Sequence, residues 1–591
     1  MPQLLIELFS EEIPARMQGA AARDLERLFT DKLKDAGLAY ESVRSFAGPR
    51  RLALVIEGLP AAQEDRTEER KGPRANAPDQ AVEGFLRSTG LTRDQLTERD
   101  GVLFANLSRK GRPTTEIVAE ALDGVIRNFP WPKSMTWGAG SLRWVRPLKR
   151  IVCLFGAEVV PFEIEGVRSG DLTEGHRFMG SGQPIQVRDF GSYRQALLDN
   201  RVVLDAADRK RTILERARKL CEDKGLQLVE DEGLLDEVAG LAEWPTPVLG
   251  DMDPAFLDLP GEVIRTSMRT HQKYFAVRDP KTDKLAAHFV TVANIEAIDG
   301  GTAIAKGNAR VLSARLNDAR FFWDEDNKPG NFERWLEKLN GVTFHAKLGT
   351  MAERVERVTA IAREIATLVG ADVEKTVEAA RFAKADLASG MVGEFPELQG
   401  VMGGYYGKER GLNRLVFEAV RDHYKPQGPG DTVPVVPVTV AVALADKIDT
   451  LAGFFAIDEK PTGSRDPYAL RRAALGVIRI LMDSDLRAPL SKLVGAWYHA
   501  LLTFASPTQA VYASSDNQSG LAGSKAAATV GTRAEPYLKE YLEALRTGDV
   551  FVVEVEREFD FDVDYVPRPE PEGEATRRFR GYPTVFKELS E

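Results

Sequence analysis

The sequence predicts an α+β multidomain protein, in which a mixed α/β amino-terminal region is followed by an all-helical domain. The chain has 591 residues, more than a single hydrophobic core ordinarily supports, so we expect about three or four domains. Strand-like apolar runs dominate before about residue 300, and after about residue 310 apolar residues recur with a helical period. Hydrophobic residues make up 43% and charged residues 28% of the chain, which is typical of a globular protein.

The first predicted region, residues 1–140, begins with a strand in QLLIELFSEE. A helix is predicted over residues 13–37, and Gly37 is a plausible residue to end it. The apolar face of this helix consists of Leu25, Leu28, Phe29 and Leu33.

The remainder of this region alternates strands, helices and one predicted linker. Two strands are predicted in SVRSFAGPRRLALVIEGL, on either side of its Gly-Pro turn. Residues 60–80 are charged and contain prolines, so they predict a linker. Residues 81–130 predict a short helix, a strand at VLFANLS and a second helix.

Three further segments follow. Residues 141–330 predict an α+β domain with strands at RIVCLFG, VVPFEIEGV and VTVANI. Residues 331–495 predict a helical domain, in which one apolar face is formed by Val355, Val358, Ile361, Ile365 and Leu368. Residues 496–591 predict a polar linker and an atypical tail, because this segment is rich in small residues and then in prolines and acids.

The motifs of several enzyme classes are missing from the sequence. We find no GxxxxGK[ST] phosphate loop, no GxGxxG after a strand, no HExxH pair and no GxSxG elbow. Cys153 and Cys221 are far apart, and the six histidines lack metal-ligand spacing. We therefore predict no catalytic residue, no metal and no cofactor on this chain.

The cellular address is expected to be cytoplasmic, without membrane contact. No run approaches the roughly 20 apolar residues that span a bilayer. The first residues carry acids where a secretory signal needs a basic start.

A formal net charge of -10 argues against indiscriminate nucleic-acid binding, but local basic patches can still bind phosphates. The candidate RNA-binding residues are Arg50, Arg51, Lys133, Trp137, Arg143, Arg146, Arg471 and Arg472. Arg50 and Arg51 flank a turn between strands, where we expect them to be exposed to phosphate; the alternative is ordinary surface charge.

The other two patches combine cations with different neighbours. Cations around Trp137 are suited to stacking and phosphate binding at an RNA end, and the alternative is a tryptophan-anchored core with extended arginines. Arg471 and Arg472 follow Ser464 and Asp466, either of which is able to cap a helix beginning near Pro467. The alternative for this pair is a buried ion-pair node.

A series of longer motifs carries a family resemblance. In chain order they are GPRRLAL, KSMTWG, EGHRF, EWPTPVLGDMDPAFLDLPGEVIRTSMRTHQKYF, GNARVLSARLNDARFFWDED, EFPELQGVMGGYY, LADKIDTLAGFF and PTGSRDPYALRRAALGVIRIL. From about residue 3 to residue 482 the chain resembles the β subunits of two-subunit bacterial glycyl-tRNA synthetases. A single hexamer would be a weak signal, whereas this ordered series is specific.

The resemblance implies a division of labour in an assembly of two α and two β chains. The α chain is expected to activate glycine with ATP and Mg²⁺, and the β chain to bind and position tRNA(Gly). Residues 1–140 are then a tRNA-interacting region and residues 141–330 a domain resembling the B3/B4-like module. The family ordinarily ends in a DALR-type anticodon-binding domain, and this chain departs from the family at residues 496–591.

The resemblance further implies that residues 331–495 form an HD-like domain. In metal-dependent HD domains, histidines and a His-Asp pair hold the ion, but here Lys384 precedes Asp386 in FAKADLASGMVGEF. Because an ammonium repels a metal ion, we expect a domain without metal ligands. Asp386, Asp446 and Asp449 are then expected to pair with Lys384 and Lys447.

Two alternatives to the synthetase subunit remain open. One is a metal-dependent HD phosphohydrolase, which the missing His-Asp pair disfavours. The other is an RNA-binding scaffold that works without a synthetase partner.

Overall fold

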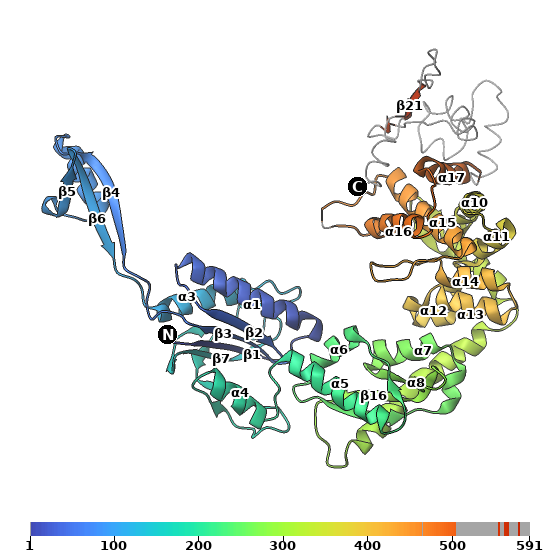
Figure 1. The fold of residues 1–591 in the computed structure, drawn as a ribbon, viewed down its shortest axis with the longest axis horizontal. Helices are drawn as coiled ribbons and strands as arrows, with labels where there is room; N and C mark the ends of the chain where they lie inside the picture. Colours follow the sequence, from blue (N-terminus) through green and yellow to red (C-terminus); the bar gives the residue numbers. More distant parts are fainter. Residues whose placement is uncertain (1, 464, 504–553, 556–560, 566–576, 580–591) are drawn as a thin grey trace. The chain divides into compact units, whose positions relative to one another are not determined.

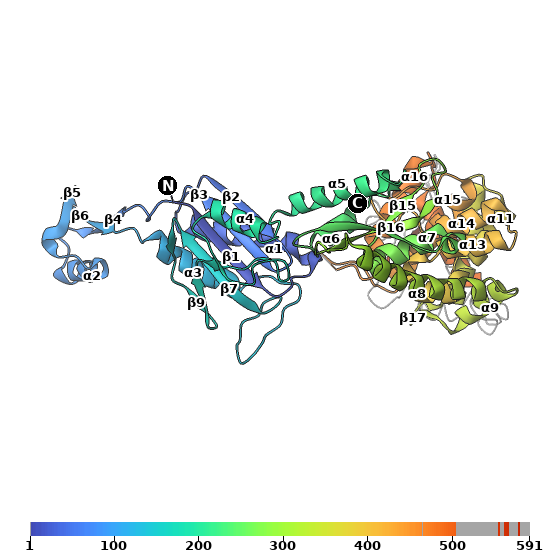
Figure 2. The same cartoon turned by 90° about the horizontal axis from the view of Figure 1, so that it is seen from below.

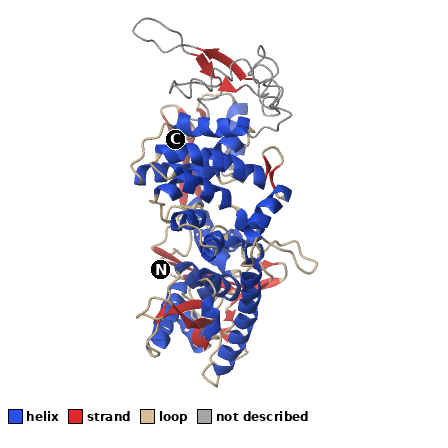
Figure 3. Cartoon of the chain, turned by 90° about the vertical axis from the view of Figure 1, so that its right-hand side faces the viewer, coloured by secondary structure: helices blue, strands red, loops and turns tan. Residues whose placement is uncertain are grey.

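The computed structural model describes residues 2–463, 465–503, 554–555, 561–565 and 577–579. Helices and strands alternate in the first half and helices predominate in the second, so the predicted mixture of α and β structure is confirmed (Figure 3). The chain divides into two compact units, the first made of residues 1–258 and 264–315 and the second of residues 259–263 and 316–591. Among the described residues, no helix has the length and apolar character needed to cross a membrane.

The main sheet of the first unit has β1 at its centre (Figures 1 and 2). Its strand order is β2 (Ser42–Ala47), β3 (Arg51–Glu57), β1 (Leu4–Ser10), β7 (Leu148–Phe155), β10 (Val167–Gly170) and β9 (Glu163–Ile164), and β8 (Glu158–Val159) also pairs with β7. Pairing is antiparallel except between β7 and β10. The strands predicted at the start of the chain and on both sides of the Gly-Pro turn are therefore confirmed.

Both faces of this sheet are covered, so every residue of β1 is buried. Side chains alternate between the faces of a strand, and Ile6 and Leu8 pack with α1 (Ala15–Asp35) and α3 (Thr114–Arg127). Leu5 packs on the opposite face with α4 (Phe190–Asp199). Figure 1 shows α1 and α4 on opposite sides of the sheet. Glu7 shares that opposite face, which places a carboxylate inside the core.

Helix α1 follows the sequence prediction closely. Leu25, Phe29 and Leu33 are buried, whereas Leu28 is half-buried. Gly37 follows the helix with a φ of 70°, a left-handed conformation that glycine adopts readily. The amide of Leu38 donates to the carbonyl of Leu33, which closes the helix end.

The predicted linker at residues 60–80 is wrong, because β4 (Arg66–Arg74) lies within it. β4 belongs to a separate sheet of order β4-β6-β5, with β6 (Val102–Arg109), β5 (Leu96–Arg99) and the neighbouring helix α2 (Asp79–Thr89). β4 pairs with β6, whose partner residues lie 28 to 43 positions further along the chain (Arg74 with Val102, Arg66 with Arg109), so the charged segment by itself does not indicate a strand.

A further sheet of the first unit has the order β13 (Gln227–Leu228), β15 (Phe275–Arg278), β16 (Leu285–Ala293) and β14 (Thr246–Asp251). Its apolar side chains pack with α5 (Ala206–Glu222) and α6 (Glu232–Ala239). β11 (Leu172–Thr173) and β12 (Ile185–Gln186) form a short hairpin-like pair, and α7 (Gly261–Thr266) leads into a π-helical turn at Ser267–Gln272.

The described part of the second unit is built mainly from helices, with a short strand pair, β17 (Thr343–His345) and β18 (Gly349–Thr350), and a small sheet near the end of the chain that is described below. The helices are α8 (Thr302–Asp326, which begins in the first unit), α9 (Asn331–Lys338), α10 (Met351–Leu368), α11 (Val373–Phe382), α12 (Gly390–Glu394), α13 (Val401–Glu409), α14 (Arg414–Asp422), α15 (Pro437–Ala456), α16 (Leu470–Asp483) and α17 (Leu490–Thr503). A helical second half is thus confirmed, although the small strand pair makes "all-helical" slightly too strong.

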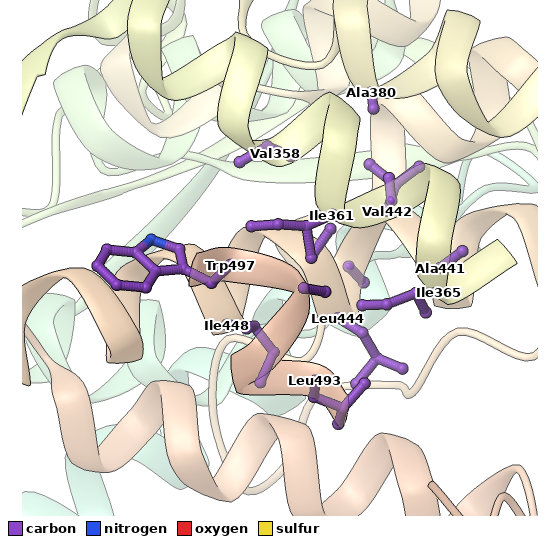
Figure 4. Packing of buried hydrophobic residues seen from close by; sticks show 14 of the residues in the cluster. Val358, Ile361, Ile365, Ala380, Ala441, Val442, Leu444, Ile448, Leu493 and Trp497 are labelled. Carbon is purple, nitrogen blue, oxygen red and sulfur yellow. The ribbon is translucent and has the colours of Figure 1, made fainter. Parts of the chain in front are cut away.

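The core of this unit surrounds α15, which is buried along almost its whole length. Figure 4 shows side chains of α10, α15 and α17 meeting there, among them Ile361, Leu444 and Trp497. Four of the five predicted core residues of α10 are buried, but Leu368 is 41% exposed, because it is the last residue of the helix. A helix buried on all sides must satisfy every polar group that it carries.

The carboxy-terminal segment agrees only partly with the prediction of a linker from residue 496. Helix α17 continues to Thr503, because its buried side chains pack on the core of the second unit. β19 (Glu554–Val555), β20 (Phe561–Tyr565) and β21 (Arg577–Phe579) form an antiparallel sheet. The linker predicted at residues 505–533 lies outside the described residues.

Candidate RNA-binding surface and two buried charge clusters

The expectation that Arg50 and Arg51 are exposed is wrong, because only 6% and 1% of these residues is accessible. Arg50 Nη2 lies 2.7 Å from Glu243 Oε2. Arg51 lies between two carboxylates, 2.9 Å from Glu7 Oε1 and 3.1 Å from Glu243 Oε1. Both guanidinium groups lie 5.1 Å from the centre of the Phe9 ring. They hold strands together inside the first unit and are not available to phosphate.

Two hydroxyl groups complete this arrangement, and we refer to the set as the arginine cluster: Glu7, Arg50, Arg51, Thr173, Tyr193 and Glu243. The hydroxyl groups of Thr173 and Tyr193 donate to the two oxygens of Glu7, at 2.6 and 2.7 Å. Burial raises the pKa of Glu243, but the charges of Arg51 and Arg50 outweigh it and the net pKa is lowered. Burial likewise opposes the charge on Arg51, yet Glu243 and Glu7 raise its pKa above the ordinary value. Arg51 and Glu243 are therefore both charged at neutral pH.

The segment from residue 130 to residue 146, here the tryptophan loop, contains the second patch that the sequence predicts. Trp144 is fully buried against Phe129 and Trp131, with ring centres 5.0 Å apart in each pair. The backbones of Met135 and Trp144 exchange hydrogen bonds of 2.8 and 3.2 Å, which close the loop between them.

Lys133 and Arg143 lie near the two ends of this closure and are exposed. Arg143 Nε donates to Ser134 Oγ at 3.2 Å, and within the described residues neither cation pairs with a carboxylate. Trp137 is half-buried, and Arg146 is half-buried and donates to the carbonyl of Val145. The loop thus contains a buried tryptophan core, as the alternative reading expected, together with two exposed cations and the half-buried Trp137.

The third patch lies at the start of α16. Asp466 accepts hydrogen bonds from the amides of Leu470 and Arg471, at 2.8 and 3.0 Å, so its side chain bonds the start of the helix as predicted, although the N-cap position itself is Ala469. The helix begins at Leu470, three residues after Pro467, and Ser464 lies outside the described residues.

Arg471 and Arg472 are exposed, so the alternative of a buried ion-pair node is wrong. The carboxylate of Asp466 occupies the amides of Leu470 and Arg471, so an anion at this end would mainly meet the two arginine side chains.

A second buried charge cluster lies in the second unit, and we refer to it as the lysine cluster: Arg354, Lys384, His423, Tyr424, Asp446 and Asp449. Lys384 Nζ lies 2.9 Å from Asp446 Oδ1 and 3.0 Å from His423 Nε2. It also lies 3.7 Å from the centre of the Tyr424 ring. Arg354 Nη2 approaches the same oxygen of Asp446 at 3.0 Å.

Hydrogen bonding fixes the protonation state of the imidazole. His423 Nδ1 lies 2.7 Å from the carbonyl of Val420 and must donate to it, so Nε2 accepts from Lys384. Burial and the neighbouring Lys384 charge hold the pKa of His423 well below its usual range. Burial lowers the pKa of Lys384 to about 8, although the charge of Asp446 opposes that change. The pKa of Asp446 lies far below its usual range, because the charges of Lys384 and Arg354 outweigh the effect of its burial.

The ion pairs expected in this region are confirmed only in part. Lys384 pairs with Asp446 as predicted. Lys447 instead donates to the carbonyls of Lys425 and Tyr424, at 2.8 and 3.2 Å. Asp449 lies 2.8 Å from Arg357 Nε.

Asp386 accepts hydrogen bonds from two backbone amides, those of Gly400 and Gly403, at 2.6 and 2.9 Å. Burial raises its pKa to about 6. Among the described residues, no group of three or more histidine, cysteine, aspartate or glutamate side chains is arranged to hold a metal ion.

Sequence reasoning did not identify His423, Tyr424, Arg354 or Arg357 as members of a site. One signal was present for the arginines, because Arg354 and Arg357 lie on the apolar face of α10 beside Val355 and Val358. Charged residues on a buried face require partners. For His423 and Tyr424 the local sequence contains no comparable signal.

Comparison with known proteins adds a direct observation. A family model described as the glycyl-tRNA synthetase beta subunit matches residues 4–545. This chain belongs to that family. The match continues past residue 482, where the resemblance in the sequence motifs ends.

Individual members of the family are similar over most of their length. The glycine–tRNA ligase beta subunit of Phenylobacterium zucineum is 67% identical over 497 residues, which cover 84% of this chain and 74% of the relative. The protein of the same name from Paracoccus denitrificans is 58% identical over 502 residues, covering 83% and 73%. The segment that the family model matches includes both buried clusters, the tryptophan loop and the start of α16.

Proposed function

We propose that this chain is the β subunit of a glycine–tRNA ligase, which binds and positions tRNA(Gly) while a companion α subunit attaches glycine. The observation that carries the proposal is the match of residues 4–545 to the beta-subunit family, with relatives of the same name at 67% and 58% identity. The relatives give no support to the alternative of a metal-dependent HD phosphohydrolase.

The tryptophan loop is the proposed tRNA contact of the first unit. Lys133 and Arg143 are exposed cations without carboxylate partners among the described residues, and Trp137 offers part of an indole face. Cations that bind phosphates beside a ring that stacks a base are suited to an unpaired RNA end. Arg471 and Arg472 form a second, smaller candidate on α16.

The assembly and its chemistry extend the same proposal. Two α and two β chains are expected, with ATP and Mg²⁺ used by the complete enzyme at the glycine-activating site of the α subunit and no cofactor on the β chain. Residues 141–330 are proposed to be a B3/B4-like domain and residues 331–495 an HD-like domain that serves as a scaffold. Because aminoacylation supplies translation, we expect the enzyme in the cytoplasm.

The experiment is glycylation of tRNA by this chain, by the purified α subunit and by the two mixed. Activity only in the mixture supports the proposal. No stimulation of the α subunit by this chain, although the α subunit forms glycyl-adenylate by itself, contradicts it.

The tryptophan loop is tested in the same mixture with a double variant, Lys133→Ala with Arg143→Ala. Two lost phosphate contacts are expected to raise KM for tRNA and to lower the slope of log affinity against log salt by about 1–2. The matched control is Arg216→Ala with Lys224→Ala, two exposed cations in and after α5. Equal behaviour of the two double variants excludes the loop as a specific contact.

A further inference from the structure

The surroundings of Lys384 Nζ resemble a ligand-binding site more than an ordinary ion pair. Three different kinds of group approach the same nitrogen: the carboxylate of Asp446 on α15, the imidazole of His423 after α14, and the ring of Tyr424. The side chain of Lys384 is 3% exposed, so these protein groups, and not bulk water, surround its ammonium.

The distances identify the class of ion that these groups suit. Lys384 Nζ lies 2.9 Å from Asp446 Oδ1 and 3.0 Å from His423 Nε2, within the usual range for hydrogen bonds from nitrogen. Zinc binds oxygen and nitrogen ligands at about 2.0–2.2 Å, so both ligands would have to move inward by roughly 0.8 Å to hold it. The 3.7 Å separation from the Tyr424 ring is a cation–π distance, which suits an ammonium ion.

The groups around the nitrogen are held in place independently of Lys384. His423 is oriented by its hydrogen bond to the carbonyl of Val420, which directs an unprotonated Nε2 at the lysine. Asp446 is also held by Arg354, at 3.0 Å. An ammonium has three N–H donors, and Asp446 and His423 use two of them, leaving the third for the face of Tyr424.

We propose that Asp446, His423 and Tyr424 form a binding site for a primary ammonium ion and that the side chain of Lys384 is its permanently attached ligand. The three groups are already arranged to bind an ammonium, and the ammonium that they bind is that of Lys384 in the same chain. It follows that shortening Lys384 opens a cavity that takes up a free primary amine in its place. This inference does not depend on the proposed tRNA function.

The test is chemical rescue of the full-length variant Lys384→Ala. Alanine keeps Cβ and lacks the three following methylenes and the ammonium group. These missing atoms correspond to n-propylammonium. We expect n-propylammonium chloride to raise the thermal midpoint of Lys384→Ala saturably, by about 3 °C or more, and to leave the wild type unchanged. If the variant does not fold by itself, the yield of folded chain from refolding with and without n-propylammonium gives the same comparison.

Three controls separate the proposal from simpler explanations. Tetramethylammonium has charge without N–H donors, and 1-propanol has the shape without charge, so neither is expected to replace n-propylammonium. Adding Asp446→Asn to Lys384→Ala keeps the shape of the cage but removes its charge, and is expected to abolish the rescue. Equal stabilisation by 1-propanol, a rescue that survives Asp446→Asn, or stronger stabilisation by Zn²⁺ than by n-propylammonium would each overturn the proposal.

Discussion

The arginine cluster of the first unit and the lysine cluster of the second both balance cations against carboxylates inside a core, but they differ in the cation. Arg51 keeps its charge because Glu243 and Glu7 raise its pKa above the ordinary value and a guanidinium is not deprotonated in proteins. In the lysine cluster, burial brings the pKa of Lys384 to about 8. Arg51 in the arginine cluster therefore stays charged, whereas Lys384 in the lysine cluster changes its protonation state near physiological pH.

The two clusters also connect the chain differently. Arg51 in β3 joins Glu7 in β1 to Glu243, so the arginine cluster ties the main sheet to the segment that leads into β14. Lys384 and Arg354 join the central helix α15 to α10 and to the segment after α11. In each cluster, the charges carried by a buried strand or helix have partners of opposite charge, and a charge is buried at acceptable cost only when it has such partners.

The largest expected effect comes from Arg51→Met. This change leaves the buried carboxylates of Glu7 and Glu243 without their shared cation, and removing one partner of a buried pair costs about 3–5 kcal/mol. Urea unfolding measures the free energy of unfolding. The matched control is Arg44→Met, whose exposed pair with Glu57 is worth about 0–1 kcal/mol. Equal losses in both variants would contradict the special role of the cluster.

A smaller effect is expected for Asp449→Asn in the lysine cluster. Asparagine still accepts the hydrogen bond of Trp497 Nε1 but loses the charge that faces Arg357 and Arg354, so the cost is about 1.5–3 kcal/mol. The same unfolding experiment applies, with the exposed Asp458→Asn as control. An unchanged midpoint for Asp449→Asn would show that this part of the cluster does not contribute to stability.

Alkaline pH distinguishes the clusters directly. The folded pKa of Lys384, about 8, lies below the ordinary 10.5, so between these values the unfolded chain binds more protons and the free energy of unfolding rises with pH. From pH 8 to pH 9.5 the stability of the wild type relative to Lys384→Met is expected to rise by roughly 1–2 kcal/mol. The charged and titratable groups that act on Lys384 or neighbour it are Asp446, Arg354, Asp386, His423, Tyr424 and Lys447.

The control for this prediction is Arg51→Met measured over the same pH range. Since Arg51 does not titrate there, the difference between the wild type and this variant is expected to stay constant. A constant difference for Lys384→Met as well would mean that its folded pKa is not lowered.

The smallest expected effect concerns the rings beside the cations. Tyr424→Phe keeps the ring that faces Lys384 and is expected to leave stability nearly unchanged, whereas Tyr424→Leu loses about 0.5–2 kcal/mol of cation–π attraction. Phe9→Leu is the corresponding change beneath Arg50 and Arg51. Equal stability of Tyr424→Leu and Tyr424→Phe in unfolding experiments would exclude a contribution from the ring face.

The elements that the sequence predicts well are those whose signal is local. The strand at Leu4–Ser10, the helix closed by Gly37 and the buried face of α10 follow from short-range periodicity and one conformationally permissive glycine. β4 was missed because its charged sequence becomes a strand only through pairing with β6. The same limit applies to the basic patches. The hydrogen bonds that Asp466 accepts at the start of α16 are local and agree with the prediction, whereas the burial of Arg50 and Arg51 depends on distant partners.

By itself, the sequence determined that the chain has a mixed first half and a helical second half, and its ordered motifs determined the family. Only the tertiary structure decided which cations are surface groups and which are internal. Arg51 pairs with Glu7 and Glu243, 44 and 192 residues away, and Lys384 meets His423 at a separation of 39 residues. Periodicity specifies the face on which a residue lies, but burial of a charge depends on partners from distant segments, and these exist only once the chain has folded.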